Sequence, residues 1–216
     1  MYKNIMFDLD GTLTDSGRAI ISSVEYALSH FEIANQPKEK LQTFIGPTLY
    51  DSFKREYNMS DADCEKAISL YRYIYEKERK YDVDIYEGIP ELIRRLKQKD
   101  CKVFLVTTKP IIFAERILEK IGLAKYFDDM VGSDLSDHSS DKKRLIEKVV
   151  EANRLEKSEC VMIGDTKYDI IGAVDAGVYS IAVTYGYGKE EEMKEAGATY
   201  IVDSVKEIEE LLVYAQ

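Results

Sequence analysis

The stretch Ile5-Met6-Phe7-Asp8-Leu9-Asp10-Gly11-Thr12 lies near the N-terminus and carries the pattern on which the predicted fold depends. It begins with apolar residues and turns polar at Asp8, which is typical of a short strand buried on both faces of a parallel sheet. The apolar runs 102–106 and 160–163 repeat this pattern and end at Thr107 and at Gly164-Asp165. Weaker apolar runs lie at 130–131, 179–183 and 199–202, so we predict a sheet of such strands.

Helical patterns separate these apolar runs. Stripes of apolar residues with helical spacing lie at 20–31, 92–96, 112–121, 145–150 and 170–174. Ser16 suits the N-cap of the first helix, and Ser204 with Glu207 forms a capping-box pattern before the last one. The alternation predicts an α/β protein whose core is a Rossmann-like, doubly wound parallel sheet with helices on both faces.

The segment 15–87 breaks the alternation, because it contains helical patterning and charge but no convincing strand. We therefore predict an all-helical cap domain at 15–87, inserted into an α/β core formed by 1–14 and 88–216. The two connections, near 15–17 and 82–88, are the natural hinges between the cap and the core.

The composition indicates a folded protein with an acidic surface. The chain has 216 residues, 45% of them hydrophobic, and its 40 acidic and 30 basic side chains give a net charge of −10. This balance argues against nucleic-acid and membrane partners, which a basic patch would bind, but it leaves room for a small anionic substrate. Three scattered cysteines, Cys64, Cys101 and Cys160, are typical of reduced thiols. We expect a cytoplasmic protein with no leader or membrane span, as a monomer or weak homodimer.

Polar residues at the ends of the three strongest strands point to chemistry. Asp8, Thr107 and Asp165 would all lie at the carboxyl edge of the sheet, where ligands bind in open α/β folds. Asp10 follows closely after Asp8, and Asp169 lies about one helical turn after Asp165, so four carboxylates would share one crevice. They would repel one another unless a hard divalent cation neutralised them, and Mg²⁺ is the best candidate.

A cation held by carboxylates can bind a phosphate group, and such a site also needs hydrogen-bond donors and positive charge. Thr107 and Thr108 offer hydroxyl groups, and Lys109 is adjacent to them. Lys142 or Lys143, just before a predicted helix, would supply an ammonium group, and the sequence leaves the choice between the two open. The pattern therefore predicts a crevice that binds phosphate.

These motifs resemble, in the same order along the chain, the four motifs of the haloacid-dehalogenase-like hydrolase superfamily. They are Asp8-Leu-Asp10-Gly-Thr12, Thr107, a lysine near residue 142, and Gly164-Asp165-x-x-x-Asp169. The inserted helical segment is similar to the cap of the phosphoglycolate-phosphatase-like branch of that superfamily. The similarity includes the stretches Phe44-Ile-Gly46-Pro47 and Tyr86-Glu-Gly88-Ile-Pro90-Glu-Leu92.

The resemblance implies a Mg²⁺-dependent phosphatase with roles for all four carboxylates. Asp8 would be the nucleophile that forms an aspartyl-phosphate. Asp10 would protonate the leaving oxygen and then deprotonate the water that hydrolyses the intermediate. Mg²⁺ would be held by the Asp8 side chain, the Asp10 backbone carbonyl and Asp165, with Asp169 supporting these ligands.

The resemblance also assigns the phosphoryl oxygens to Thr107 and Lys142, with the backbone around Gly11 assisting. Thr108 stands where many relatives carry asparagine, and we expect it in the same substrate site because its hydroxyl lies at the same strand end. We expect the substrate to be a small phosphorylated metabolite, with phosphoglycolate and nucleoside 5′-monophosphates as candidates. The sequence leaves two alternatives open. One is a sugar phosphomutase of the same fold, and the other is a non-enzymatic receiver module that accepts a phosphoryl group on an aspartate.

Overall fold

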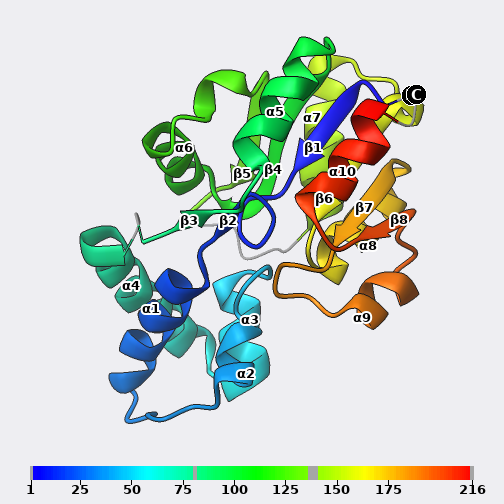
Figure 1. Ribbon diagram of the computed structural model, residues 1–216. Helices are drawn as coiled ribbons and strands as arrows, with labels where there is room; N and C mark the ends of the chain where they lie inside the picture. Colours follow the sequence, from blue (N-terminus) through cyan, green and yellow to red (C-terminus); the bar gives the residue numbers. More distant parts are fainter. Residues whose placement is uncertain (1, 80–81, 136–140, 215–216) are drawn as a thin grey trace.

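The centre of the molecule is a six-stranded parallel sheet (Figure 1). The protein is described here by a computed structural model that covers residues 2–79, 82–135 and 141–214. The strands of the sheet are β1 (Asn4–Phe7), β4 (Lys102–Pro110), β5 (Asp129–Ser133), β6 (Cys160–Gly164), β7 (Tyr179–Val183) and β8 (Tyr200–Val202). They lie in the order β5-β4-β1-β6-β7-β8, and every neighbouring pair is parallel. The arrangement confirms the predicted α/β core.

Helices cover both faces of this sheet, because successive residues of a strand point to opposite faces. Ile5 and Phe7 pack in one buried cluster with residues of α5, α6 and α10, whereas Met6 packs in another with residues of α7 and α8. A smaller cluster joins α8 and β7 to α9 through Met193. The helices are α5 (Ile89–Gln98), α6 (Ile111–Lys120), α7 (Lys142–Asn153), α8 (Lys167–Ala176), α9 (Glu190–Glu195) and α10 (Val205–Glu209). Short 3₁₀ turns lie at Ala124–Tyr126 and Lys157–Glu159, and a π-helical turn at Glu210–Tyr214 follows α10.

Strand β1 lies in the middle of the sheet, at the point where the strand order reverses. β4 and β5 lie on one side of it, and β6, β7 and β8 lie on the other. Open α/β sheets bind their ligands beyond the carboxyl ends of the strands at such a reversal. Asp8 directly follows β1 and is buried there, with 3% of its surface exposed.

Strand β4 runs further than the sequence pattern predicts. It continues past Thr107 to Pro110, and its register with β5 shifts between Val106 and Pro110. Proline lacks the N–H group that a regular ladder requires, so the pairing cannot continue unbroken. The irregular stretch presents residues 107–109 beside the end of β1, where Lys109 contacts Asp10.

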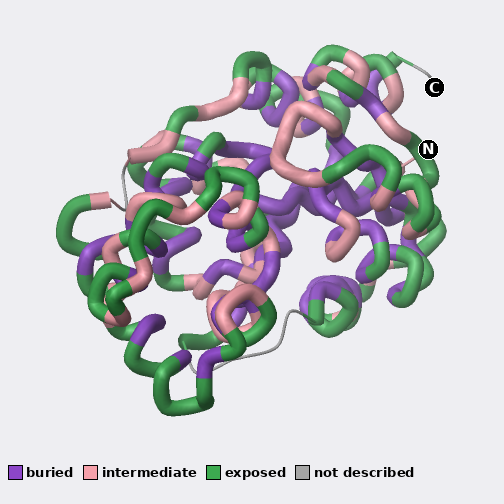
Figure 2. The backbone as a smooth tube through the Cα atoms, turned by 90° about the horizontal axis from the view of Figure 1, so that it is seen from below, coloured by how far each residue is buried: buried purple, intermediate pink, exposed green. Residues whose placement is uncertain are grey.

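The cap is a separate group of helices between two short strands (Figure 1). Figure 2 shows that buried segments gather in the interior of the molecule and exposed segments lie around its outside. Strands β2 (Thr14–Asp15) and β3 (Asp84–Ile85) pair with each other in antiparallel fashion and carry the chain into and out of the helices. The helices pack around their own buried cluster, to which the core adds Phe113 of α6. They are α1 (Gly17–Ser29), α2 (Lys38–Gln42), α3 (Leu49–Tyr57), α4 (Asp61–Ile74) and a π-helical turn at Tyr75–Arg79. The division at residues 15 and 87 stays our proposal.

Two details of the predicted helices differ from expectation. Ile171 and Val174 of α8 are 43% and 49% exposed instead of buried, because the face that α8 turns to the sheet carries Ile170 and Ala173. The capping box predicted at Ser204 forms only one of its two bonds: the Ser204 hydroxyl accepts from the Glu207 N–H. The Glu207 carboxylate accepts from the N–H of Asp203 instead of that of Ser204. Predicted patterns of this kind locate helices better than they assign individual faces.

The remaining expectations concern the membrane and the cysteines. Among the described residues, no helix has both the length and the apolar character that crossing a bilayer requires. All three cysteines are buried and free of disulfides, as their scattered positions predicted.

Candidate active site

Three carboxylates meet at the carboxyl edge of the sheet. Asp8 follows β1, Asp165 follows β6, and Asp169 lies in the first turn of α8. Their side chains place one oxygen each within 4.8 Å of the others, and all three are buried. The structure therefore brings together three of the four acids that the sequence motifs predicted.

Lys142 places its ammonium group among these carboxylates. Its Nζ donates to Asp8 Oδ1 at 2.8 Å and to the carbonyl of Val106 at 3.1 Å, and it lies 2.7 Å from Asp169 Oδ1. The adjacent Lys143 is exposed and lies 4.0 Å from Glu147. Of the two lysines that the sequence left open, Lys142 is the one that reaches the acids.

The burial of these charges shifts their pKa values. Desolvation raises the pKa of Asp8 to about 6; the Lys142 ammonium opposes the shift, and the Asp169 carboxylate adds to it. Burial raises the pKa of Asp165 well above its usual value, and the carboxylates of Asp169 and Asp8 raise it further. Burial alone would lower the pKa of Lys142, but Asp169 and Asp8 outweigh it and raise that pKa. The cluster thus contains three carboxylates that repel one another and one ammonium group that offsets part of this repulsion.

The donor set fits a hard divalent cation. All the candidate ligand atoms are carboxylate oxygens, and one ammonium faces three carboxylates, so the site retains negative charge. Asp169 is fixed by a capping box, in which its carboxylate accepts from the N–H of Thr166 at 3.1 Å and from the Thr166 hydroxyl at 2.8 Å. This tie suits the supporting role that the motif resemblance gives Asp169.

Asp10 lies outside this carboxylate group and has a different partner. Its side chain is paired with Lys109, whose Nζ lies 3.2 Å and 2.9 Å from the two carboxylate oxygens. The ammonium also lies 4.9 Å from the centre of the Tyr75 ring, which belongs to the cap. The predicted contribution of Asp10 to the metal through its backbone carbonyl remains a prediction.

Gly11 lets the first motif approach Asp165 closely. Its φ of +84° is a conformation that side chains disfavour, and a Cβ there would lie 2.1 Å from Asp165 Oδ2. The two threonines after Val106 differ in their contacts. Thr107 is buried, and its hydroxyl accepts from the Lys109 N–H at 3.2 Å. Thr108, by contrast, donates to the carbonyl of Gly46 in the cap at 2.6 Å.

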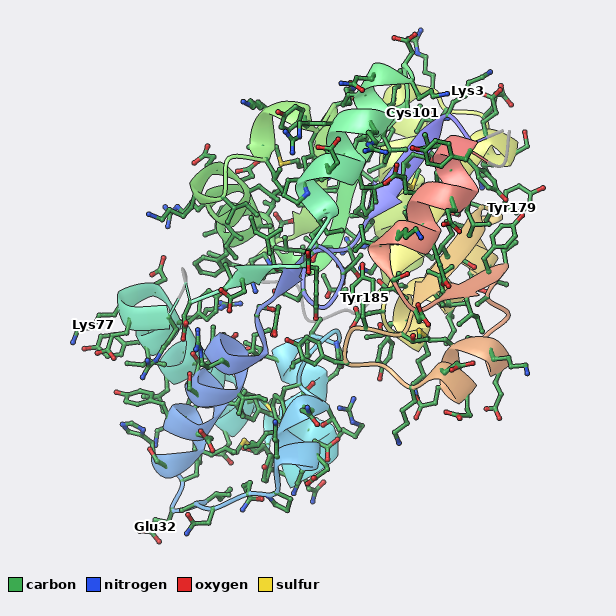
Figure 3. The ribbon with its side chains drawn as sticks, in the orientation of Figure 1. Lys3, Glu32, Lys77, Cys101, Tyr179 and Tyr185 are labelled. Atoms are coloured by element: carbon green, nitrogen blue, oxygen red, sulfur yellow. The ribbon has the colours of Figure 1, made fainter. Side chains whose placement is uncertain are left out.

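The loop after β7 contains contacts that the sequence motifs did not predict. The N–H of Tyr187 donates to Asp165 Oδ2 at 2.8 Å, and its hydroxyl donates to Asp15 and accepts from the N–H of Gly17. The hydroxyl of Tyr185, labelled in Figure 3 where the cap and the core meet, donates to the carbonyl of Thr12 at 2.9 Å. The spacing Tyr185-Gly-Tyr187-Gly after a strand was the available signal.

A small cavity of about 80 Å³ lies between the cap and the core. The core side contributes Asp10, Thr108 and Lys109, and the cap side contributes residues of α4 and the loop around Gly46. Asp10, which follows Asp8 by two residues, borders this cavity. Among the described residues, this arrangement combines a possible nucleophile, cation ligands, an ammonium group and a cavity bordered by Asp10.

Comparisons with known proteins agree with this geometry. Residues 5–183 match the family model of haloacid dehalogenase-like hydrolases. A 5′-nucleotidase of Pseudomonas aeruginosa is 33% identical over 98% of this chain and 96% of its own length. A phosphoglycolate phosphatase of Vibrio parahaemolyticus is 29% identical over 97% of this chain and 96% of its own length.

A solved structure is also similar over nearly the whole chain. It is described as a predicted phosphatase from Clostridium acetobutylicum, is 40% identical, and superimposes with a TM-score of 0.95 over 99% of both chains. The similarity thus extends through the cap as well as the sheet, and the named relatives agree with the expected type of enzyme. The chain therefore belongs to the haloacid dehalogenase-like hydrolase family, as its motifs predicted, and it is a hydrolase.

Proposed function

We propose that this protein is a Mg²⁺-dependent phosphatase that hydrolyses a small phosphate monoester through a phosphorylated Asp8. The observation that carries the proposal is the buried contact of Lys142 with both Asp8 and Asp169, beside Asp165 and at the reversal point of the sheet. The names of the 5′-nucleotidase and phosphoglycolate phosphatase relatives support a phosphate ester as the substrate.

The residues divide the reaction between them. An Asp8 carboxylate oxygen attacks phosphorus and displaces the ester oxygen, and Asp10 donates a proton to that leaving oxygen. Asp10 then takes a proton from water, which attacks the phosphorus of the acyl-phosphate and releases phosphate and the free Asp8 carboxylate. Lys142 and Thr107 hold the phosphoryl oxygens during both displacements.

The metal completes the charge balance of the site. Asp8, Asp165 and the carbonyl of Asp10 would hold Mg²⁺, and bound Mg²⁺ supplies positive charge that offsets the charge developing on the phosphoryl group. The Lys142 ammonium contacts both Asp8 and Asp169, and these contacts hold the Asp8 carboxylate in place. The cap excludes bulk water from the crevice when it is closed over the core.

Removal of the nucleophile tests the proposal. Asp8→Asn keeps the size of the side chain but lacks the attacking oxygen, so phosphate release from a panel of phosphate monoesters with Mg²⁺ should fall to background. Asp175→Asn, an exposed aspartate on α8, is the matched control and should keep full activity. Phosphate release by the Asp8→Asn variant at the normal rate would refute the assignment.

Product analysis separates the alternatives. Release of free phosphate with turnover supports the phosphatase, and isomerisation of a sugar phosphate would instead indicate the mutase. Stable phosphorylation by acetyl phosphate without turnover would indicate the receiver module.

A further inference from the structure

Each of the two aspartates of the first motif has a buried lysine of its own. Asp8 accepts from Lys142 at 2.8 Å through one oxygen, whereas both carboxylate oxygens of Asp10 contact the Lys109 ammonium, at 3.2 Å and 2.9 Å. The proposed reaction uses Lys142 at the phosphoryl group but gives Lys109 no task. The contact of Lys109 with the proposed acid and base therefore needs an explanation of its own.

The contact through both oxygens restrains the orientation of the Asp10 carboxyl group. One contact would leave the group free to turn about the bond that carries it, and a second contact opposes this rotation. The side chains of Lys109 and Asp10 are only 7% and 11% exposed, so water and salt screen their attraction little. Burial also means that either charge is costly without the other, which favours the paired arrangement.

The backbone of Lys109 is fixed on two sides. Its N–H donates to the Thr107 hydroxyl at 3.2 Å. Strand β5 passes so close that a Cβ at Gly132 would lie 2.7 Å from the Lys109 carbonyl oxygen, and the Ser133 hydroxyl donates to the carbonyl of Thr108 at 2.6 Å. The Lys109 side chain thus reaches Asp10 from a well-anchored position at the end of β4.

Aromatic rings of the cap lie against the same ammonium group. The Lys109 Nζ is 4.9 Å from the centre of the Tyr75 ring, a distance at which a cation is attracted to the face of an aromatic ring. Tyr75 stacks on Tyr71, with ring centres 5.5 Å apart, and its ring meets Phe113 of α6 edge-on at 5.8 Å. These packed rings hold Lys109 on the side of Asp10.

We propose that Lys109 is a positioning residue that orients the Asp10 carboxyl group for proton transfer. The inference rests on the proposed phosphatase function and adds a residue to its machinery. As the bond between phosphorus and the leaving oxygen breaks, a proton passes from Asp10 to that oxygen, and the Lys109 ammonium stabilises the carboxylate that remains. The same carboxylate then takes a proton from the attacking water, while Lys109 keeps its own protons throughout.

The dependence of the rate on the leaving group tests this role. Phenyl phosphate and 4-nitrophenyl phosphate differ only in a nitro group far from phosphorus, but phenolate is the more basic leaving group and gains more from a proton. General acid–base catalysis contributes about 10²–10⁴-fold, so a misplaced Asp10 should slow the phenyl ester more. In Lys109→Met, measured with Mg²⁺, the ratio of kcat/KM for phenyl over 4-nitrophenyl phosphate should fall about tenfold below that of the wild type.

A general structural defect would lower both values of kcat/KM by a similar factor and would cancel in this ratio. Lys109→Arg keeps the positive charge beside Asp10 and should restore most of the ratio that Lys109→Met loses. Lys148→Met, at an exposed position on α7, is the matched control and should keep the wild-type ratio.

A double variant shows whether Lys109 acts through Asp10. Asp10→Asn should itself lower the ratio, and adding Lys109→Met to it should change the ratio no further, because no acid is left to orient. The double variant also removes both charges of the buried pair, so it provides the comparison even where Lys109→Met alone does not fold.

The outcomes distinguish this inference from the function on which it rests. A wild-type ratio in Lys109→Met, or a further fall of the ratio when Lys109→Met is added to Asp10→Asn, overturns the positioning role and leaves the phosphatase intact. If the wild-type protein with Mg²⁺ releases phosphate from neither ester nor from the other members of the monoester panel, the proposed function itself fails.

Discussion

Lys142 is the residue on which the charge balance of the site depends. Its buried ammonium contacts both Asp8 and Asp169, so Lys142→Met leaves these carboxylates without their cation. Removing one partner of a buried ion pair usually costs about 3–5 kcal/mol, and we expect a loss of this size in urea denaturation of the metal-free protein. Phosphate release should fall at least about 100-fold, because the phosphoryl oxygens lose a positive charge.

Lys143→Met is the matched control for this change, because Lys143 is exposed and pairs loosely with Glu147. It should change neither the denaturation midpoint nor the rate of phosphate release. Equal effects of the two substitutions would contradict the role given to Lys142.

The carboxylates should make the metal-free protein less stable as the pH rises. Burial raises the pKa of Asp8 to about 6, so between about pH 4 and pH 6 the folded protein holds a proton that the unfolded chain has released. The raised pKa of Asp165 acts in the same direction. The free energy of unfolding should therefore fall as the pH rises through this window.

Mg²⁺ should reverse this loss, because it binds the deprotonated carboxylates. At pH 7.5, a Mg²⁺ concentration of about 100 times the Kd would add about 2.7 kcal/mol to the free energy of unfolding, which corresponds to roughly 5–10 °C in Tm. The same concentration should add much less at pH 5. Thermal unfolding of the wild type and of Asp165→Asn, with Asp175→Asn as control, measures this. An equal gain at both pH values, or a normal response in Asp165→Asn, would contradict the metal assignment.

At the scale of elements, the strands and their polar ends could be predicted because each strand is a continuous apolar run that is buried on both faces. Asp8 and Asp165 stand where those runs end, so their place at one edge of the sheet follows from the strands alone. The choice between Lys142 and Lys143, for which the motif resemblance favoured Lys142, could not be settled from the local pattern. It depends on where α7 begins and on its close approach to α8, where a Cβ at Gly172 would lie 2.7 Å from Lys142 Cβ.

The partner of Asp10 and the loop after β7 could not be predicted for a similar reason. Asp10 contacts Lys109 because β4 loses its regular register after Val106, a feature of strand pairing and not of local pattern. The loop approaches Asp165 so closely that a Cβ at Gly186 would lie 2.3 Å from the Asp165 Cβ. Contacts of this kind arise from the tertiary fold.

The hydroxyl of Tyr187 connects this loop to the first connection of the cap. It donates to Asp15 and accepts from the Gly17 N–H at 2.7 Å, while its own N–H holds Asp165. Tyr187→Phe should loosen the connection by about 1 kcal/mol and leave the Asp165 contact in place. We expect faster amide hydrogen exchange at residues 15–17 with unchanged Mg²⁺ affinity.

Tyr185→Phe is the matched control, because its hydroxyl contacts the Thr12 carbonyl instead of the cap connection. It should leave exchange at 15–17 as in the wild type. Exchange that stays slow in Tyr187→Phe would show that the hydroxyl does not hold the connection.

At the scale of the whole molecule, the acidic surplus is compatible with the anionic substrate that we propose, because charge is distributed unevenly. The net charge of −10 describes the entire chain, whereas the enclosed site combines Lys142 with its carboxylates and the neighbouring cavity has an excess of cations. The cap contributes to this local environment because its residues line the cavity together with those of the core. It approaches closely at Gly46, where a Cβ would lie 3.0 Å from Thr166 Cγ2.

Thr108 has two possible roles at this junction. The sequence predicts that it binds the substrate, whereas its hydroxyl contacts the cap in the structure. The hydroxyl donates to the Gly46 carbonyl at 2.6 Å, so Thr108→Val, which keeps the shape, should free the cap loop. Amide exchange at 44–48 should rise in the substrate-free protein, by an amount corresponding to about 1 kcal/mol. The hydroxyl of Thr43 donates to the Lys40 carbonyl within the cap. Thr43→Val should therefore leave the amide exchange at 44–48 unchanged. A raised KM without faster exchange would instead show that Thr108 binds the substrate directly.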